Sequence, residues 1–264
     1  MRIAVLIASH NRRETTLECL RSLGSFHGKV FLTDGGSTDG TADAVEKEFP
    51  DAKIIRRGSD VWWAGGMRLA WEAAAAEGGW DAYLWLNDDV KLAPDALAEL
   101  MSATDGRTVV TGMLREPGTD VVSYGADDLG LKKIPAEKRV DVRGFLHGNC
   151  LLVPAQVYAE VGGMSPRFVH NFADMEFGER LRRKGVRIVA VGPVGARARH
   201  PPYDRRLFRT MSFSERLAAI RDPKRIAAKD WIWFKRLTRG RFWAALSAIK
   251  MGLLVLCPRL VVRP

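Results

Sequence analysis

LWLNDDV, residues Leu84–Val90, is the stretch that decides the fold. Its first three residues extend an apolar run that begins at Ala82, a pattern typical of a short buried strand. The run ends abruptly at Asn87, Asp88 and Asp89. Adjacent carboxylates repel each other, and a bound divalent cation relieves that repulsion. Because ligands in open α/β sheets bind beyond the carboxyl ends of the strands, the stretch indicates either a metal site or an Asx-rich turn before a helix.

The residues around this stretch alternate between strand and helix patterns. Further strands are predicted over Ile3–Ala8, Val30–Thr33, Lys53–Arg56, Val109–Met113, Phe145–Val153 and Val186–Val191. Helices are predicted over Arg13–Leu23, from Thr41, over Gly66–Ala76 and Pro154–Val161, and before Gly185. This alternation predicts an α/β fold with a mostly parallel sheet and helices on both faces. Residues 116–143 lack it and are expected to form an irregular excursion.

Composition and charge narrow the class of protein. The 264 residues are 47% apolar, enough for a sizeable core. The three cysteines form no C-x-x-C pair, which argues against a zinc site and fits a reducing, cytoplasmic location. The N-terminal apolar run of six residues is too short for the apolar region of a signal peptide. The net charge of +10 comes from the end of the chain, since residues 205–264 hold 15 basic and three acidic side chains.

The glycine-rich stretch DGGSTDG, Asp34–Gly40, follows the second predicted strand. It is neither a G-x-G-x-x-G dinucleotide motif after the first strand nor a phosphate-binding P-loop. The carboxylate of Asp34 could accept hydrogen bonds from a base or a ribose, and the glycines beside it let a ligand approach the backbone. For Ser37, Thr38 and Asp39 a turn and helix cap is the favoured interpretation.

Two later stretches add candidates for the same edge of the sheet. Asp174 and Glu176 fall near the start of a predicted helix, where the helix dipole favours anions, and ordinary charge complementarity explains them equally well. His200 ends a predicted strand before two prolines. A lone histidine is usually structural or solvated, but one at the same edge as two carboxylates could complete a metal site.

Taken together, the motifs resemble a known family. They are VLIASHNR, LTDGGSTDGT, WWAGGMRLAWEAA, LNDDV, GNCLLVP, VGGMSPRF and FADMEFGERLRRKG, followed by His200. In this order they resemble the inverting nucleotide-sugar glycosyltransferases of family 2, which have the GT-A fold, and among them the bacterial rhamnosyltransferase-like enzymes. The resemblance covers residues 1–203, and the ordered set is far more specific than any single motif.

The resemblance implies roles for particular residues. Asp34 matches the acid that reads uracil or thymine, and Asp89 matches the last acid of the D-x-D metal motif. Asp174 matches the catalytic acid, and His200 matches a histidine that some members use as a further metal ligand. The nucleotide-binding residues that it implies are Asp34, Ser9, Asn11, Gly65, Gly66 and Asp88.

Four positions depart from the family pattern. Gly35 stands where many relatives have a second acid, which predicts fewer contacts to the base or ribose. Asn87 replaces the first acid of D-x-D, as in some rhamnosyltransferase-like members, so Asp89 is the surer ligand. Ala173 and Glu176 replace the acids on either side of the catalytic position. The departures at Gly35, Asn87 and Ala173 leave a catalytically silent, membrane-associated scaffold as an alternative. A sugar-nucleotide pyrophosphorylase is a weaker one, because no glycine-rich basic loop follows the first strand.

The residue types fit metal-dependent sugar transfer. The leaving group of a nucleotide-sugar donor is a nucleoside diphosphate, whose charge Mg²⁺ or Mn²⁺ neutralises with few protein ligands. A histidine ligand such as His200 favours Mn²⁺. Asp174 would take the proton of the acceptor hydroxyl, and a single displacement inverts the anomeric carbon. The expected donor is a UDP- or dTDP-sugar, and the expected acceptor is a glycan or polyprenyl-linked molecule of cell-envelope polysaccharide synthesis.

Two regions are expected, a GT-A domain over residues 1–204 and a basic tail over residues 205–264. Residues 1–113 would form the nucleotide-binding half of the domain and residues 114–204 the acceptor-binding half. In the tail, apolar residues recur every three or four positions between basic ones, which predicts two amphipathic helices. The apolar run Phe242–Cys257 is shorter than the roughly 20 residues of a membrane span.

The tail is therefore expected to bind the anionic inner face of the cell membrane, and packing on the domain is the alternative. No nucleic-acid partner is expected, because the aromatic residues have core-like spacing and no nucleic-acid-binding module is present.

Overall fold

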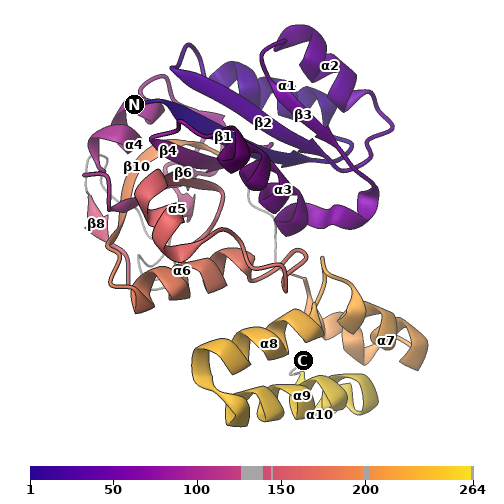
Figure 1. The fold of residues 1–264 in the computed structure, drawn as a ribbon. Helices are drawn as coiled ribbons and strands as arrows, with labels where there is room; N and C mark the ends of the chain where they lie inside the picture. The colour runs from indigo at the N-terminus through magenta and orange to yellow at the C-terminus, as the bar shows by residue number, and fades with distance from the viewer. Residues whose placement is uncertain (126–138, 144, 199–202, 263–264) are drawn as a thin grey trace.

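The computed structural model describes residues 1–125, 139–143, 145–198 and 203–262, and its body is built on a ten-stranded sheet (Figure 1). The strand order is β3-β2-β1-β4-β9-β6-β10-β5, with β7 paired to β6 and β8 paired to β10. The strands are β1 (Ile3–Ser9), β2 (Gly28–Asp34), β3 (Lys53–Arg56), β4 (Ala82–Leu86), β5 (Lys91–Leu92), β6 (Val109–Arg115), β7 (Val122–Tyr124), β8 (Val140–Asp141), β9 (Cys150–Pro154) and β10 (Ile188–Ala196). β1 is parallel to β2 and β4, whereas β9 runs antiparallel between β4 and β6. The predicted α/β fold is confirmed, with a mixed, mostly parallel sheet.

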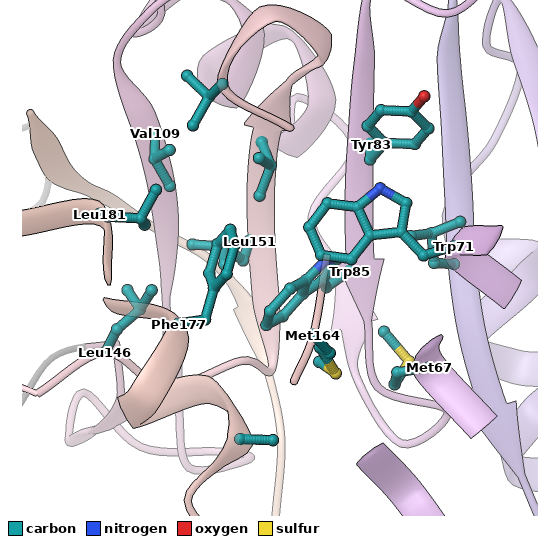
Figure 2. Close-up of a cluster of buried hydrophobic side chains, with 14 of the residues drawn as sticks. Met67, Trp71, Tyr83, Trp85, Val109, Leu146, Leu151, Met164, Phe177 and Leu181 are labelled. Atoms are coloured by element: carbon teal, nitrogen blue, oxygen red, sulfur yellow. The ribbon is translucent and has the colours of Figure 1, made fainter. Parts of the chain in front are cut away.

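Strand β4 lies at the centre, and its side chains fill the core on both faces of the sheet. Tyr83 and Trp85 belong to one core cluster, where Trp85 contacts Trp71 edge to face at 5.1 Å and packs against Phe177 at 5.0 Å between ring centroids (Figure 2). Leu84 belongs to the cluster on the opposite face. Alternate residues of a strand point to opposite faces, so a strand buried on both reads as a continuous apolar run.

Helices cover both faces, as predicted. Helices α3 (Trp62–Glu77), α5 (Ala155–Val161) and α6 (Ala173–Arg183) contribute to the Trp85 cluster, and α1 (Arg13–Ser22), α2 (Thr41–Glu48) and α4 (Ala96–Ser102) to the Leu84 cluster. The short 3₁₀ helix η1 (Ser59–Val61) precedes α3. The predicted helix Gly66–Ala76 is longer in the structure, because α3 already begins at Trp62. Its glycines serve packing, since a Cβ on Gly66 would lie 2.8 Å from the Cβ of Ala8 in β1.

The tail folds into helices that lie below the body in Figure 1. They are η3 (Arg205–Arg209), α7 (Phe213–Arg221), α8 (Ala228–Arg239), α9 (Arg241–Leu256) and α10 (Pro258–Val261), and α8 and α9 correspond to the predicted amphipathic pair. α8 buries Phe234 in the same core cluster as Trp85, so the tail shares part of its packing with the body. None of the helices in the described ranges combines the length and apolarity of a membrane span.

Some predicted boundaries differ from the observed ones around the site. The predicted strand Phe145–Val153 is shorter in the structure, because β9 begins only at Cys150 and a turn precedes it. The predicted strand Val186–Val191 continues as β10 to Ala196 past an irregularity after Val191. In the expected excursion, the described residues form β7 and β8, and residues 126–138 lie outside them.

Candidate active site

A cleft of ≈ 910 Å³ opens where β1, β2 and β4 end. Parallel strands that run side by side bring their carboxyl ends to one edge, so residues distant in sequence meet there. The lining includes Ser9, His10 and Arg12 after β1, Gly35 after β2, Trp62, Trp63 and Gly66 of α3, Asn87 and Asp88 after β4, Asp174 of α6, Arg197 after β10, and Lys224, Arg225 and Ile226 before α8.

Asp88 and Asp89 lie at this edge in contact with two arginines. Arg12 Nη1 donates to Asp88 Oδ1 at 3.1 Å and to Asp89 Oδ2 at 2.9 Å. Arg197 donates to both oxygens of Asp89, from Nε at 2.5 Å and from Nη2 at 3.1 Å. Burial raises the pKa of Asp88 to about 6, an effect that Arg12 opposes and Asp89 reinforces. Guanidinium groups thus compensate the charge of the acidic pair.

Asn87 has a structural task that a carboxylate could not perform. Its Oδ1 accepts a hydrogen bond from Trp63 Nε1 at 2.8 Å, while its Nδ2 donates to Asn149 Oδ1 at 2.8 Å. An ionised carboxylate accepts hydrogen bonds but has none to donate, so an acid here would lose the second bond. Trp63 itself both packs against the Trp85 cluster and lines the cleft.

Asp34 ends β2 and is 4% exposed. Its Oδ2 accepts a hydrogen bond from the backbone N–H of Ser37 at 3.1 Å. Its Oδ1 is buried and has no hydrogen-bond partner among the described residues. The neighbouring Thr33 and Gly35 line the cleft. Because buried carboxylate oxygens are normally hydrogen-bonded, this atom marks a position where a ligand could donate.

The resemblance implies further nucleotide-binding residues, and only some of them line the cleft. Ser9 and Gly66 line the cleft. Asn11 has φ 51° and accepts a hydrogen bond from the backbone N–H of Thr38 at 2.7 Å, which ties the loop after β1 to the loop after β2. Gly65 lies inside α3, against the side chain of Val61. Asn11 and Gly65 therefore shape the structure around the cleft.

Asp174 in the first turn of α6 faces the same cleft. Its Oδ2 accepts a hydrogen bond from the backbone N–H of Gly148 at 3.0 Å, and its Oδ1 accepts one from the N–H of Met175 at 2.9 Å. A Cβ on Gly148 would lie 2.9 Å from Trp63 and 3.1 Å from the Cβ of Asp174, so only glycine permits this approach. Two backbone donors thus fix the orientation of the carboxylate.

Three cleft residues were not singled out from the sequence. Arg12 and Arg197 lie in basic stretches, and only the fold reveals that both contact Asp89. His170 packs against Trp62, with ring centroids 5.9 Å apart, and its Nδ1 is buried without a partner in the described part of the chain. Burial lowers the pKa of His170, and the charge of nearby Lys224 lowers it further.

The predicted metal site is only partly described. His200 lies outside the described residues. Within those residues, no group of three or more His, Cys, Asp and Glu side chains could hold a metal ion. Two adjacent carboxylates still match the sparse protein ligand set that Mg²⁺ uses beside phosphate oxygens and waters. These carboxylates fit a cation when bonds to the cation replace their hydrogen bonds to Arg12 and Arg197.

Comparisons with known proteins identify the family. The profile of glycosyl transferase family 2 matches residues 4–161, more than half of the chain. The chain therefore belongs to glycosyl transferase family 2.

One curated protein is similar in sequence over more than half of the chain. It is an N-acetylglucosaminyl-diphospho-decaprenol L-rhamnosyltransferase from Mycobacterium tuberculosis, 25% identical over 191 residues, a match that covers 59% of this chain and 61% of the relative. The same enzyme from a second strain gives the same match. The chain thus spans less than two thirds of the length of these relatives.

Solved structures share the fold. A mannosyltransferase from Pyrobaculum calidifontis in complex with GDP-Man and Mn²⁺ has a TM-score of 0.55 at 17% identity, covering 97% of this chain and 81% of that one. S. aureus TarS 1–349 in complex with UDP-GlcNAc has a TM-score of 0.60 at 14% identity, with 97% and 82% covered. At these identities the likeness shows a GT-A-like fold.

Proposed function

We propose that the protein is a metal-dependent, inverting glycosyltransferase that moves a sugar from a UDP- or dTDP-sugar to a glycan or lipid-linked acceptor in cell-envelope polysaccharide synthesis. The observation that carries the proposal is that acids from distant parts of the chain meet around one cleft. Asp88 and Asp174 line it, and Asp34 stands in the chain between the lining residues Thr33 and Gly35. The two structural neighbours with nucleotide-sugars bound support this class of donor.

The free oxygen of Asp34 supports a role in base recognition. A uracil or thymine ring presents an N–H donor between two carbonyl groups, and Asp34 Oδ1 is a buried acceptor with no partner in the described part of the protein. Such a bond satisfies an atom that is otherwise costly to bury, which favours a base with a ring N–H at this position. Gly35 lets the ring approach the backbone.

The acidic pair, Asp88 and Asp89, supports the proposal that the protein uses a divalent cation. The mannosyltransferase with a similar fold is in complex with Mn²⁺. When bound, Mg²⁺ or Mn²⁺ would supply positive charge to the departing diphosphate. Asp89 and Asp88 would hold it, with His200 as a further candidate ligand.

Asp174 supports the inverting mechanism as general base. Its carboxylate is fixed by Gly148 and Met175 and faces the cleft. It would accept the proton of the acceptor hydroxyl as the oxygen attacks the anomeric carbon opposite the leaving diphosphate. A single base and a single displacement give inversion.

The test of this mechanism is Asp174→Asn. We expect sugar transfer to fall by ~10²-fold or more, the usual contribution of a general base, with unchanged donor binding. Donor binding is followed by thermal shift with a panel of nucleotide-sugars and Mn²⁺, because a bound ligand stabilises the folded state. Near-normal turnover would remove Asp174 from the mechanism. A wild-type protein that binds donors but neither transfers nor hydrolyses them would favour the silent scaffold.

The basic residues of the tail support the proposal that the acceptor is anionic and attached to a lipid. The curated relative is named for a diphospho-decaprenol-linked acceptor. In this chain, Arg205, Lys224 and Arg225 of the tail line the cleft. These cations would attract the phosphates of such an acceptor.

Membrane attachment through the tail is supported by an apolar stripe on α9 and α10. Its members are Phe242, Leu246, Ile249, Leu253, Leu256 and Leu260, which are 38% to 77% exposed. Spacings of three and four residues place side chains on one face of a helix. Exposed Arg241, Lys250 and Arg259 accompany the stripe. This combination is typical of helices that lie in an anionic membrane surface.

Point substitutions test the attachment without removing the part of the tail that lines the cleft. Burying one large apolar side chain contributes ~1.5–3 kcal/mol, so changing Phe242, Ile249 and Leu256 to Ser should weaken binding to anionic vesicles by at least about 100-fold. Phe213→Ser is the matched control, because Phe213 is an exposed aromatic residue of the tail outside the stripe. Unchanged partitioning of the triple variant would contradict the attachment.

A further inference from the structure

Arg197, beside the acidic motif, is held more firmly than the arginines of surface ion pairs are. Arg197 presents two donors to the two oxygens of Asp89, and both side chains are almost buried, at 11% and 10% exposure. The guanidinium of Arg197 also lies over the ring of Tyr124, 4.5 Å from its centroid. Arg12 bridges Asp88 and Asp89 from the loop after β1. Three separate segments thus build this cluster.

The charges of the cluster set conditions for what can bind there. Two carboxylates and two guanidinium groups already balance. A divalent cation that arrived alone would have to break these pairs and leave two guanidinium groups uncompensated, and breaking a buried ion pair is strongly destabilising. A diphosphate that arrived alone would meet guanidinium groups that are already paired. When both arrive, the carboxylates can bind the cation and the guanidinium groups can bind the phosphates.

We propose that Arg12 and Arg197 form the binding site for the diphosphate of the donor, and that Asp88 and Asp89 hold this site closed in the free protein. The cation and the diphosphate then bind with strong positive cooperativity, because each releases the partner that the other needs. The guanidinium fork suits phosphate oxygens, to which it donates two parallel hydrogen bonds. The proposal rests on the proposed function for the identity of the diphosphate as that of a nucleotide-sugar.

The experiment measures Mn²⁺ binding by the electron paramagnetic resonance signal of the free ion, with and without UDP, after subtraction of the Mn²⁺ that UDP or pyrophosphate binds in protein-free solution. Couplings between sites typically span 5–150-fold, and we expect saturating UDP to tighten Mn²⁺ binding by at least about tenfold. Linkage requires that Mn²⁺ tighten UDP binding by the same factor, which calorimetry measures independently. Equal Mn²⁺ affinity with and without UDP and with and without pyrophosphate would overturn the proposal.

Arg197→Gln separates the proposed role from a purely structural one. The variant frees Asp89 from its fork, so Mn²⁺ alone should bind more tightly, while the coupling to UDP should fall at least about fivefold. Arg197→Lys keeps the charge without the fork and should fall in between. Arg12→Gln, at a residue whose side chain is 41% exposed, leaves the Arg197 fork in place and should also weaken the coupling, which keeps the test valid if Arg197→Gln fails to fold. Unchanged Mn²⁺ affinity and coupling in the folded variants would overturn the proposal.

Two controls make the result specific. Arg187→Gln removes an exposed pair with Asp141 before the other end of β10 and should change neither affinity. Inorganic pyrophosphate repeats the experiment without a base or sugar. Coupling to pyrophosphate in a protein that binds no UDP or dTDP would refute the proposed donor and still support the arginine site. Coupling to UDP without coupling to pyrophosphate would overturn the arginine site.

Discussion

In residues 1–204, 28 acidic side chains nearly balance 26 basic ones, whereas residues 205–264 carry 15 basic and three acidic side chains. The two regions also differ in apolar exposure, since nine of the twelve large hydrophobic side chains that are exposed in the described residues belong to the tail. In the body, Arg12 and Arg197 pair with Asp88 and Asp89 at the edge of the sheet. The tail directs both charge and apolar surface outward. The comparison separates a region whose acidic and basic side chains nearly balance from one whose basic and apolar side chains lie exposed.

The largest expected difference between the regions is in stability. Phe177 is fully buried beside Trp85, so Phe177→Ala should lower the free energy of unfolding by ~3–5 kcal/mol, the usual effect of emptying an aromatic core position. Leu260 is 77% exposed, and Leu260→Ala should change the free energy by less than ~0.5 kcal/mol. Urea titrations measure both variants. A large effect at Leu260 would mean that the tail surface is covered within the protein.

A second prediction tests the charge of the tail separately from its apolar stripe. Each basic residue near an anionic membrane contributes ~1 kcal/mol, so changing Arg241, Lys250 and Arg259 to Gln should weaken binding to anionic vesicles by about 100-fold. Binding to neutral vesicles should not change. Sedimentation with vesicles at two salt concentrations measures this, and the salt dependence should shrink in the variant. An equal loss on both kinds of vesicle would assign these residues to folding.

A third prediction uses the buried carboxylate where the two regions meet. Asp230 of α8 is 4% exposed, and burial raises its pKa above the unfolded value of about 3.9. A raised pKa in the folded state contributes stability below the unfolded pKa, and this contribution is lost as the pH rises through the folded pKa. The side chain of Asp230→Asn does not titrate. The melting temperature of this variant should therefore rise relative to that of the wild type as the pH increases from 4 to 7. A difference that does not vary with pH would contradict this assignment.

The smallest effect expected concerns the thiols, and it leaves the fold unchanged. Cys19 and Cys150 are buried in the body, and burial raises the pKa of Cys150 to about 12, whereas Cys257 is exposed in the tail. Because the thiolate is the reactive form, only Cys257 should react with a thiol reagent in the native protein. All three should react in denaturant. Rapid labelling of a second thiol under native conditions would show that the body opens locally.

The sequence predicted the framework well for a physical reason. Ala82–Leu86 was predicted and observed with the same bounds, because a strand buried on both faces has a continuous apolar run that ends at the first polar residue. Asp34, Asp88 and Asp174 were identified because each follows a strand or begins a helix at the edge where ligands bind. The family pattern supplied their order along the chain.

What the sequence could not supply depends on contacts between distant segments. Nothing in the chain around Arg197 indicates that its guanidinium group reaches Asp89, and the partner of Asn87, Asn149, is 62 residues away. The predicted helix began only at Gly66, four residues late, because sequence alone does not distinguish a flexible turn from a helix packed tightly on a strand. These contacts form only when the helices pack on the sheet.

The segment before α8 has a consequence for acceptor choice. Lys224 and Ile226 line the cleft, α8 shares its buried Phe234 with the body, and α9, which carries most of the apolar stripe, packs on α8. With α9 resting on a bilayer, the distance from the lipid surface to Asp174 would be set by this packing. Acceptors whose reactive hydroxyl stands too near to or too far from their lipid anchor would then be rejected by reach alone.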